Sequence, residues 1–374
     1  MNLKFKNGKF TIMQVSDPQD LQYTRGTMIR MLNTAYDEFK PDLVVFTGDN
    51  ILGNHLHDAR LLTKYKVKDK ASEGEAMKTA IDHICAPLEK RKIPFAMIYG
   101  NHDDMNLHTK DEQAEFYRQY KYNLGLDDPD SPDVATYNLP IYSEDGSKIK
   151  FNIWMMDSAW KDKELDKCFT DVKAEAVEWY KNKSKKLAAE NGGEAVPSIM
   201  FQHVPMQEIM ELVDVSDEKV EGAIEGKDQL EGKFLKLKNG VTGEMGEQPS
   251  FVTNKVGQFE AIKECGDVKA VVTGHDHHNG FEGEFDGIKF IQTPAASFRC
   301  YGHQNRGVRM FTVDEATGDF TTKHYTYKDI CGNGILQKLS YIWDADDMVK
   351  QKIGLIAGTV SVVAVIIALL IALF

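Results

Sequence analysis

Short apolar runs alternate with longer amphipathic stretches along most of the chain. Short runs rich in β-branched residues are typical of buried strands, whereas apolar residues spaced three and four positions apart are typical of helices. This pattern predicts strands at residues 10–15, 43–47, 93–99, 134–139, 149–156, 198–202, 268–273, 280–285, 288–293, 308–313 and 321–327. It predicts helices at residues 27–39, 75–89, 110–122, 172–189 and 254–265. Together these elements indicate an α/β fold.

The last stretch of the sequence has a different character, because residues 353–374 carry no charge. A helix of this length spans roughly 33 Å at ~1.5 Å per residue, enough to cross a hydrocarbon core of ~30 Å. The alternative, a buried core helix, is normally shorter and amphipathic. Lys350 and Lys352 precede the run, and positive flanks favour the cytosolic side. We therefore expect a single-pass tail anchor in the cell membrane with the large domain facing the cytoplasm.

The sequence also predicts a linker and an inserted segment. Residues 331–352 are predicted to be a linker between a folded domain at residues 1–330 and the anchor. Residues 213–250 are acidic, rich in glycine and weakly periodic, which predicts an inserted loop or lid of low order. Within the anchor, Gly354 and Gly358 lie four positions apart, a spacing that permits close helix packing, so a homodimer through the anchor is left open.

Composition narrows the class of protein. Of 374 residues, 42% are apolar and 27% are charged, which is ordinary for a globular protein with a substantial core. The formal net charge of −12, with no block of Lys and Arg clear of nearby acids, argues against a nucleic-acid surface. The five cysteines are scattered and form no Cys-x-x-Cys pair, which fits a reducing compartment. The first residues have no pattern typical of a signal peptide.

Candidate metal ligands follow five of the predicted strands. His275 and His277 lie two positions apart after the strand at 268–273, and neutral imidazole is a common metal ligand. The other four sites are Asp17-x-Gln19, Gly48-Asp49-Asn50, Gly100-Asn101-His102-Asp103 and His203-Val204-Pro205. Each motif alone is more often an ordinary turn or loop. Since open α/β sheets place their sites at the carboxyl ends of strands, the set predicts one metal centre.

The sequence does not decide the roles of several other polar residues. His55 and His57 follow the second motif and are interpreted as solvated loop residues, with substrate contact as the alternative. Arg299 has a guanidinium that matches phosphate geometry, and the alternative is a surface ion pair. His278 and His303 are interpreted as surface residues.

In their order along the chain these five motifs resemble those of the calcineurin-like metallophosphoesterases. The element His203-Val204-Pro205 is most similar to the purple-acid-phosphatase-related branch. The resemblance covers residue 10 to about residue 327, without the 213–250 insertion and the anchor. It implies a four-layer α/β/β/α sandwich that binds two metal ions (Mn, Fe or Zn) and hydrolyses a phosphate monoester or diester by attack of metal-bound hydroxide.

The family pattern implies a role for each matching position. One metal ion would be held by Asp17, Gln19, Asp49 and His277. The other would be held by Asp49, Asn101, His203 and His275, so that Asp49 bridges the two. His102 would contact the phosphate and protonate the leaving alkoxide, and Asn101 would also face the substrate.

Two positions depart from that pattern. Gln19 stands where the family normally has histidine, and a more oxygen-rich site favours manganese, magnesium or iron over zinc. Leu52 stands where many relatives have an aspartate that orients the catalytic histidine, so Asp103 or a backbone carbonyl is expected to hold His102. An alternative function follows from Gln19, namely a non-catalytic membrane-tethered binding module with a degenerate metal site. A third keeps the enzyme but assigns a lipid-linked phosphate as substrate.

Overall fold

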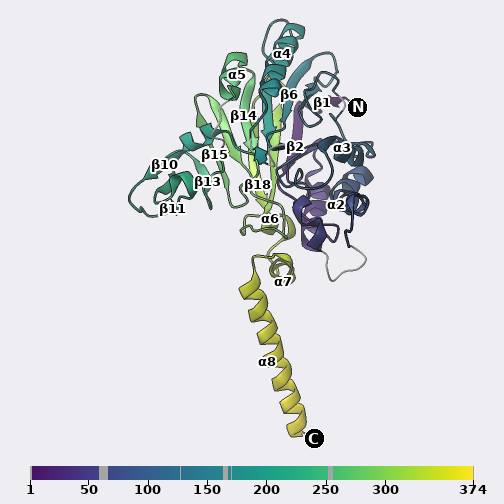
Figure 1. Ribbon diagram of the computed structural model, residues 1–374, viewed down its shortest axis with the longest axis vertical. Coiled ribbons are helices and arrows are strands. Elements are labelled where there is room, and N and C mark those ends of the chain that lie inside the picture. The colour runs from purple at the N-terminus through teal and green to yellow at the C-terminus, as the bar shows by residue number, and fades with distance from the viewer. Residues whose placement is uncertain are drawn as a thin grey trace.

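The computed structural model describes residues 2–58, 66–126, 128–162, 167–169, 171–251 and 256–373. The predicted start of the helix at 254–265, the side chain of Cys168 and the last residue of the anchor lie outside these described residues. Two β-sheets form the centre of the molecule, helices cover them on both sides, and one long helix leaves the body at its lower end (Figure 1).

The smaller sheet has the strand order β18-β17-β2-β3-β4. Its strands are β2 (Lys9–Val15), β3 (Leu43–Thr47), β4 (Phe95–Ile98), β17 (Gly307–Asp314) and β18 (Phe320–Thr326). Strands β2, β3 and β4 are parallel, and α1 (Gly26–Phe39) and α2 (Lys70–Arg91) connect them. Because the three strands run the same way, the residues that follow them lie at one edge of the sheet.

The larger sheet has the order β1-β5-β6-β9-β14-β16-β15-β13. Its strands are β1 (Leu3–Lys4), β5 (Tyr137–Tyr142), β6 (Ile149–Met156), β9 (Ser198–Gln202), β13 (Thr242–Glu244), β14 (Val268–Thr273), β15 (Gly280–Phe285) and β16 (Ile288–Gln292). The central strands β6, β9, β14 and β16 are parallel. Helices α4 (Ala174–Glu190) and α5 (Gln258–Cys265) lie in the connections that lead into β9 and β14.

Alternate residues of β6 belong to two different cores. Ile153 and Met155 pack in the core that also holds the strands of the smaller sheet. Trp154 and Met156 pack instead with the buried face of α4. Since successive strand residues point to opposite faces, the larger sheet separates an inner core from an outer one. The fold is therefore the four-layer α/β/β/α sandwich that the family resemblance implies.

Side-chain caps set several helix boundaries. Asp69 accepts from the backbone N–H of Ser72 in a capping box, so α2 begins at Lys70, five residues earlier than the sequence predicts. Thr109 and Glu112 form the same motif at the start of α3 (Lys110–Arg118). Helix α3 is four residues shorter than the predicted helix at 110–122, because Tyr120 and Asn123 enter turn hydrogen bonds beyond it.

The low order predicted for residues 213–250 is wrong, and the role of this inserted segment as a lid stays a prediction. This segment forms a three-stranded sheet, β10-β12-β11, from β10 (Val213–Ser216), β11 (Ile224–Glu225) and β12 (Phe234–Leu237). It projects from one side of the body (Figure 1). The side chains of Val213 and Leu235 are buried, while most others are exposed, so the small sheet needs few apolar residues and leaves a weak pattern in the sequence.

The prediction of a linker at residues 331–352 is also wrong. Helices α6 (Tyr327–Cys331) and α7 (Ile335–Asp344) pack against α1, and Tyr341 and Ala345 are buried in the inner core. The backbone N–H of Thr27 donates to the Asp344 carboxylate at 2.7 Å. Helix α8 (Val349–Leu373) follows, and residues 349–370 are long and apolar enough to cross a membrane. The folded domain therefore continues almost to the start of α8.

Candidate metal centre

The five motifs that follow strands meet between the two sheets. Asp17, Asp49 and Asn101 follow β2, β3 and β4 of the smaller sheet, and His203 and His275 follow β9 and β14 of the larger one. Carboxylate and imidazole side chains of these motifs form two groups, and within each group the potential ligand atoms lie within 4.8 Å of one another. One group is Asp49, His203 and His275, and the other is Asp17, Asp49 and His277, so the two groups share Asp49.

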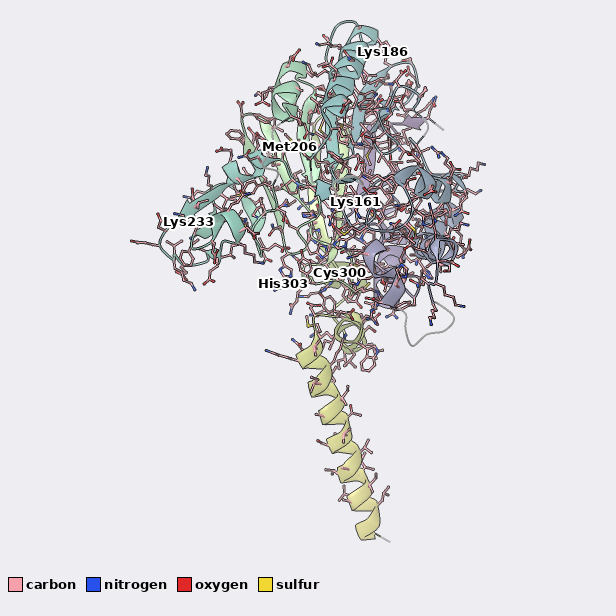
Figure 2. The ribbon with its side chains drawn as sticks, in the orientation of Figure 1. Lys161, Lys186, Met206, Lys233, Cys300 and His303 are labelled. Atoms are coloured by element: carbon pink, nitrogen blue, oxygen red, sulfur yellow. The ribbon has the colours of Figure 1, made fainter. Side chains whose placement is uncertain are left out.

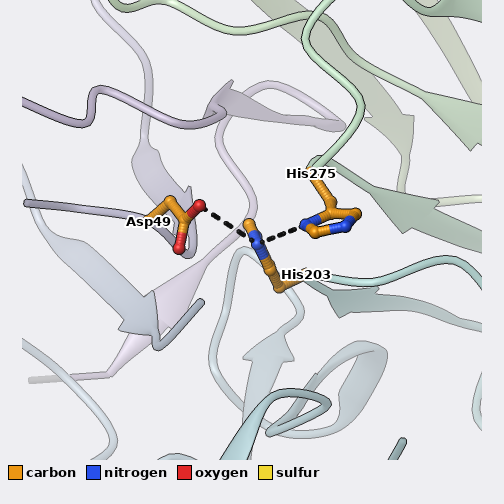
Figure 3. A group of neighbouring side chains, drawn as sticks. All are labelled: Asp49, His203 and His275. Atoms are coloured by element: carbon orange, nitrogen blue, oxygen red, sulfur yellow. Dashed lines mark hydrogen bonds and ion pairs between the residues drawn. The ribbon is translucent and has the colours of Figure 1, made fainter. Parts of the chain in front are cut away.

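His203 is the centre of the first group. Its Nε2 atom lies 3.5 Å from Oδ2 of Asp49 and 3.1 Å from Nδ1 of His275 (Figure 3). The side-chain oxygen of Asn101 lies 3.1 Å from the same nitrogen. On the other side of the ring, Nδ1 is 2.9 Å from the carbonyl oxygen of Thr47 and donates to it. This hydrogen bond fixes the ring and turns Nε2 toward the centre, as is usual for a ligand histidine.

His277 has the corresponding position in the second group. Its Nε2 atom lies 3.6 Å from Oδ1 of Asp17. Its Nδ1 atom donates to the carbonyl oxygen of Tyr301 at 2.7 Å, and the two rings stack with centroids 4.2 Å apart. Gln19 completes this side, because its amide nitrogen donates to Oδ2 of Asp49 at 3.1 Å. The structure thus brings together all seven residues that the sequence predicts as ligands.

Two buried oxygens in the centre have no hydrogen-bond donor among the described residues. They are Oδ1 of Asp17 and Oε1 of Gln19. A buried acceptor without a partner costs roughly 1–3 kcal/mol, and more when it is charged. Coordination to a cation is one way in which such buried oxygens are satisfied. The donor set of carboxylate and amide oxygens with imidazole nitrogens fits a divalent ion such as manganese, iron or zinc.

The backbone around the centre is strained. Asp17 and Asp49 both have φ of 47° and His275 has φ of 70°, in the left-handed region that residues with a Cβ rarely adopt. Gly48 has φ of 87°, and a Cβ there would lie 2.6 Å from Nδ1 of His203 and 2.8 Å from the Gly100 nitrogen. Strain of this kind is typical of functional sites, where the surrounding structure holds it in place.

The buried carboxylates and imidazoles of the centre shift one another's pKa values. Burial opposes ionisation of Asp49, but the neighbouring imidazole of His203 outweighs it and holds the pKa of Asp49 well below its ordinary value. Burial likewise disfavours the charged form of His203, yet the Asp49 carboxylate raises the pKa of this histidine to about 10. Burial lowers the pKa of His275 to about 4, and His203 adds to this effect. In the protein alone, a protonated His203 balances the carboxylates.

His102 is held by a residue that the sequence did not reveal. Its Nδ1 atom lies 2.9 Å from the side-chain oxygen of Asn54, which belongs to the short helix η1 (Gly53–Asp58). The backbone N–H of His102 donates to Oδ1 of Asp49 at 2.8 Å. The expectation that Asp103 or a backbone carbonyl holds the ring is wrong, because the Asn54 amide takes this position.

Asp103 connects two loops of the metal centre by hydrogen bonds. Its carboxylate accepts hydrogen bonds from the backbone N–H groups of Gly100 at 2.8 Å, Asn50 at 3.0 Å and Ile51 at 3.0 Å. These bonds join the turn after β3 to the turn after β4. Asp103 therefore fixes the two loops that carry Asp49 and Asn101 relative to each other.

Arg299 forms an ion pair, but a buried one. Its Nε atom contacts the carboxylate of Asp20, and Nη2 donates to the carbonyl oxygen of Tyr23 at 2.8 Å. The guanidinium also lies over the Tyr23 ring, 4.5 Å from the centroid. The predicted ion pair is therefore present, but it is buried and not at the surface. Arg299 holds the segment that follows Gln19 in place. Phosphate contact by Arg299 stays a prediction.

Neither ligand group includes His55, His57, His278 or His303. His55 pairs with Asp58 at 2.8 Å, and His57 with Glu73 at 3.0 Å. His278 and His303 have ring centroids 5.9 Å apart.

Comparison with known proteins shows the family of the chain. The calcineurin-like phosphoesterase family matches residues 10–279, so the chain belongs to that family. It is 26% identical over 347 residues to a protein of Arabidopsis thaliana named probable inactive purple acid phosphatase 29, covering 82% of this chain and 77% of that one. It is 25% identical over 273 residues to phosphatase DCR2 of Saccharomyces cerevisiae, covering 70% of this chain and 39% of that one.

Solved structures also match this chain. One is a dimetal phosphatase from Danio rerio, which is 13% identical and matches 85% of this chain and 99% of its own length with a TM-score of 0.48.

Proposed function

We propose that this protein is a phosphoesterase that uses two metal ions to hydrolyse a phosphate monoester or diester. The proposal rests on one observation, the two ligand groups that share Asp49 and enclose buried oxygens of Asp17 and Gln19 without donors among the described residues. Membership of the calcineurin-like phosphoesterase family supports it.

Each ligand group would hold one cation. Asp17, Gln19, Asp49 and His277 would hold the first, and Asp49, Asn101, His203 and His275 the second. When bound, two such cations neutralise charge on the phosphoryl oxygens and lower the pKa of water. The hydrogen bonds from His203 to Thr47 and from His277 to Tyr301 keep both imidazoles in the orientation that this task requires.

His102 is the residue we assign to proton transfer. Asn54 accepts a hydrogen bond from Nδ1, which leaves Nε2 to carry a proton to the leaving alkoxide. Burial lowers the pKa of His102 and the Asp49 carboxylate partly offsets this effect, so the imidazolium gives up its proton readily. Water returns the proton after the alcohol departs.

A non-catalytic binding protein is the second candidate. Gln19 donates to the shared Asp49 carboxylate, a contact that competes with a cation for the same oxygen. Two relatives in Arabidopsis thaliana are named probable inactive purple acid phosphatases. In that case the centre would bind one cation or none and would turn over no phosphate ester.

One experiment separates the two candidates. The full chain, purified in detergent, is assayed for metal content and for hydrolysis of a generic aryl phosphate monoester and diester with manganese, iron or zinc. We expect about two metals per chain and activity that falls at least about 100-fold in Asp49→Asn and His102→Gln. His83→Ala, on the outer helix α2, is the matched control and should keep wild-type activity. A folded protein with one metal or none and no turnover would favour the binding protein.

We also propose that α8 anchors the protein in a membrane with the folded domain on the cytoplasmic side. The length and apolar composition of residues 349–370 support the span, and Lys350 and Lys352 at its beginning support the orientation. Protease digestion of sealed microsomes tests it, since a cytoplasmic domain is cleaved without detergent. Protection of the domain until detergent is added would show the opposite orientation.

A further inference from the structure

Helix α7 has an apolar face that the protein leaves bare. Ile335, Leu336 and Trp343 are 78%, 74% and 61% exposed, and Leu339 lies on the same side. On the opposite side, Tyr341 is buried and packs against the rings of Phe298 and Tyr327. Four large apolar side chains on one side of a ten-residue helix form a patch that soluble proteins rarely expose.

This apolar face is continuous with the start of α8. Leu339 and Trp343 line a hollow of about 680 Å³ together with Leu355, Ile356 and Val360 of α8. Helix α7 lies at the end of the body from which α8 departs (Figure 1). The same lipid surface that surrounds the first turns of α8 would therefore reach α7.

We infer that α7 is an interfacial helix that inserts its apolar face into the surface of a lipid bilayer. Amphipathic helices lie in the membrane plane with their apolar residues at the boundary of headgroups and acyl chains. Trp343 would occupy the interfacial level that tryptophan prefers. Arg30, which lines the same hollow, lies 3.4 Å from the Ser340 hydroxyl and would meet the lipid phosphates. The inference rests on the proposed membrane span of α8 and not on catalysis.

Hydrogen bonds connect this helix to the metal centre. The Tyr341 hydroxyl donates to the carbonyl oxygen of His303 at 2.7 Å. The backbone N–H of Asp346 donates to the carbonyl oxygen of Phe298 at 2.9 Å. The loop between Phe298 and His303 includes Tyr301, whose carbonyl orients His277. His303 and Cys300 lie at the lower end of the body, just above α8 (Figure 2). When α7 contacts lipid, this loop therefore lies on the side of the domain that faces the membrane.

Tryptophan fluorescence tests the inference. The full chain is reconstituted in phosphatidylcholine vesicles with or without lipids brominated in their acyl chains, which quench nearby tryptophan. Trp343→Phe isolates the signal of Trp343, and Trp179→Phe, on α4 at the far end of the body, is the matched control. We expect brominated lipid to quench the wild type about twofold more than Trp343→Phe, and to quench Trp179→Phe like the wild type.

Acrylamide, a quencher dissolved in water, provides the opposing measurement. Quenching of the Trp343 signal by acrylamide but not by brominated lipid would overturn the inference, because the face would then be in water. Protection from both quenchers would overturn it as well, because a protein surface would then cover α7. Leu339→Glu is a second variant that keeps Trp343, and it should reduce the bromine effect if the face lies in lipid.

Discussion

The Nδ1 atom of His102 lies 2.9 Å from Oδ1 of Asn54, and this contact joins the loop after β4 to the short helix after β3. A neutral amide thus holds the ring that we assign to proton transfer. Many relatives are expected to use a carboxylate, at the position that Leu52 occupies here. An amide fixes the ring without placing a further negative charge beside Asp49.

Replacing Asn54 tests this arrangement. Asn54→Ala should lower kcat about 10- to 100-fold, because the ring loses its orientation while the ligands stay in place. KM and metal content should change little, and Asn54→Asp should restore much of kcat because it again offers an acceptor oxygen. Steady-state kinetics with metal analysis checks this. An equal loss of metal and activity in Asn54→Ala would show a structural role instead.

Gln19 is predicted to weaken the first metal position. Gln19→His supplies an imidazole where the family pattern has one and should raise metal affinity about 10-fold or more. Gln19→Ala removes the amide oxygen and should leave about one metal per chain. Elemental analysis after dialysis against a range of metal concentrations measures both effects. Gln119→Ala, at the end of α3, serves as the control, and identical metal binding by all four proteins would contradict the prediction.

Gly48 cannot carry a side chain. In Gly48→Ala the new methyl group would press on His203 and on the Gly100 backbone, in addition to the strain of a positive φ. We expect a loss of at least about 2 kcal/mol in the free energy of unfolding and a loss of metal binding. Gly8→Ala is the matched control: Gly8 also has positive φ, but no described atom lies within 4 Å of the added carbon. That variant should lose only about 1 kcal/mol and keep its metals.

His324 makes the stability of the domain depend on pH. Burial lowers its pKa to about 4 from 6.5, and the nearby Arg309 adds to this effect. Between these values the unfolded chain binds a proton that the folded protein does not, so stability falls as pH falls from 6.5 toward 4. The loss should approach about 3 kcal/mol at the acid end. Denaturant titrations across this range should show a shallower dependence for His324→Gln.

The position at which the chain can be shortened follows from α7. A protein that stops after residue 330 loses Tyr341 and Asp347, which both bind the guanidinium of the fully buried Arg306 at 2.8 Å. An unpaired buried charge costs roughly 3–5 kcal/mol. A protein that stops after residue 348 keeps both partners and should melt like the full chain in detergent. Similar melting temperatures for the two shortened proteins would show that α7 is dispensable.

Much of the sandwich is readable from the sequence. Strands β3, β6, β9 and β14 have the predicted bounds, because buried parallel strands are short continuous apolar runs between turn residues. Asp49, Asn101, His203 and His275 were predicted to meet because parallel strands end at a common edge. Their proximity followed from the arrangement of the strands and required no knowledge of individual side-chain positions.

The groups that orient the ligands left no such pattern. The carbonyl oxygens of Thr47 and Tyr301 hold His203 and His277, and a backbone atom has no signature in the sequence. Asn54 reaches His102 only because a short helix folds back after β3. Helix α7 was missed for another reason, since its apolar residues face outward and resemble an irregular linker.

The left-handed conformations of Asp17, Asp49 and His275 connect metal supply to the amount of protein in the cell. Each strained residue costs roughly 1–3 kcal/mol, a large part of the net stability of a domain. Cations that bind only the folded centre offset this cost by mass action. When the metal is scarce, a larger fraction of chains would open and be degraded. Under the proposed function, scarcity would then reduce abundance as well as turnover.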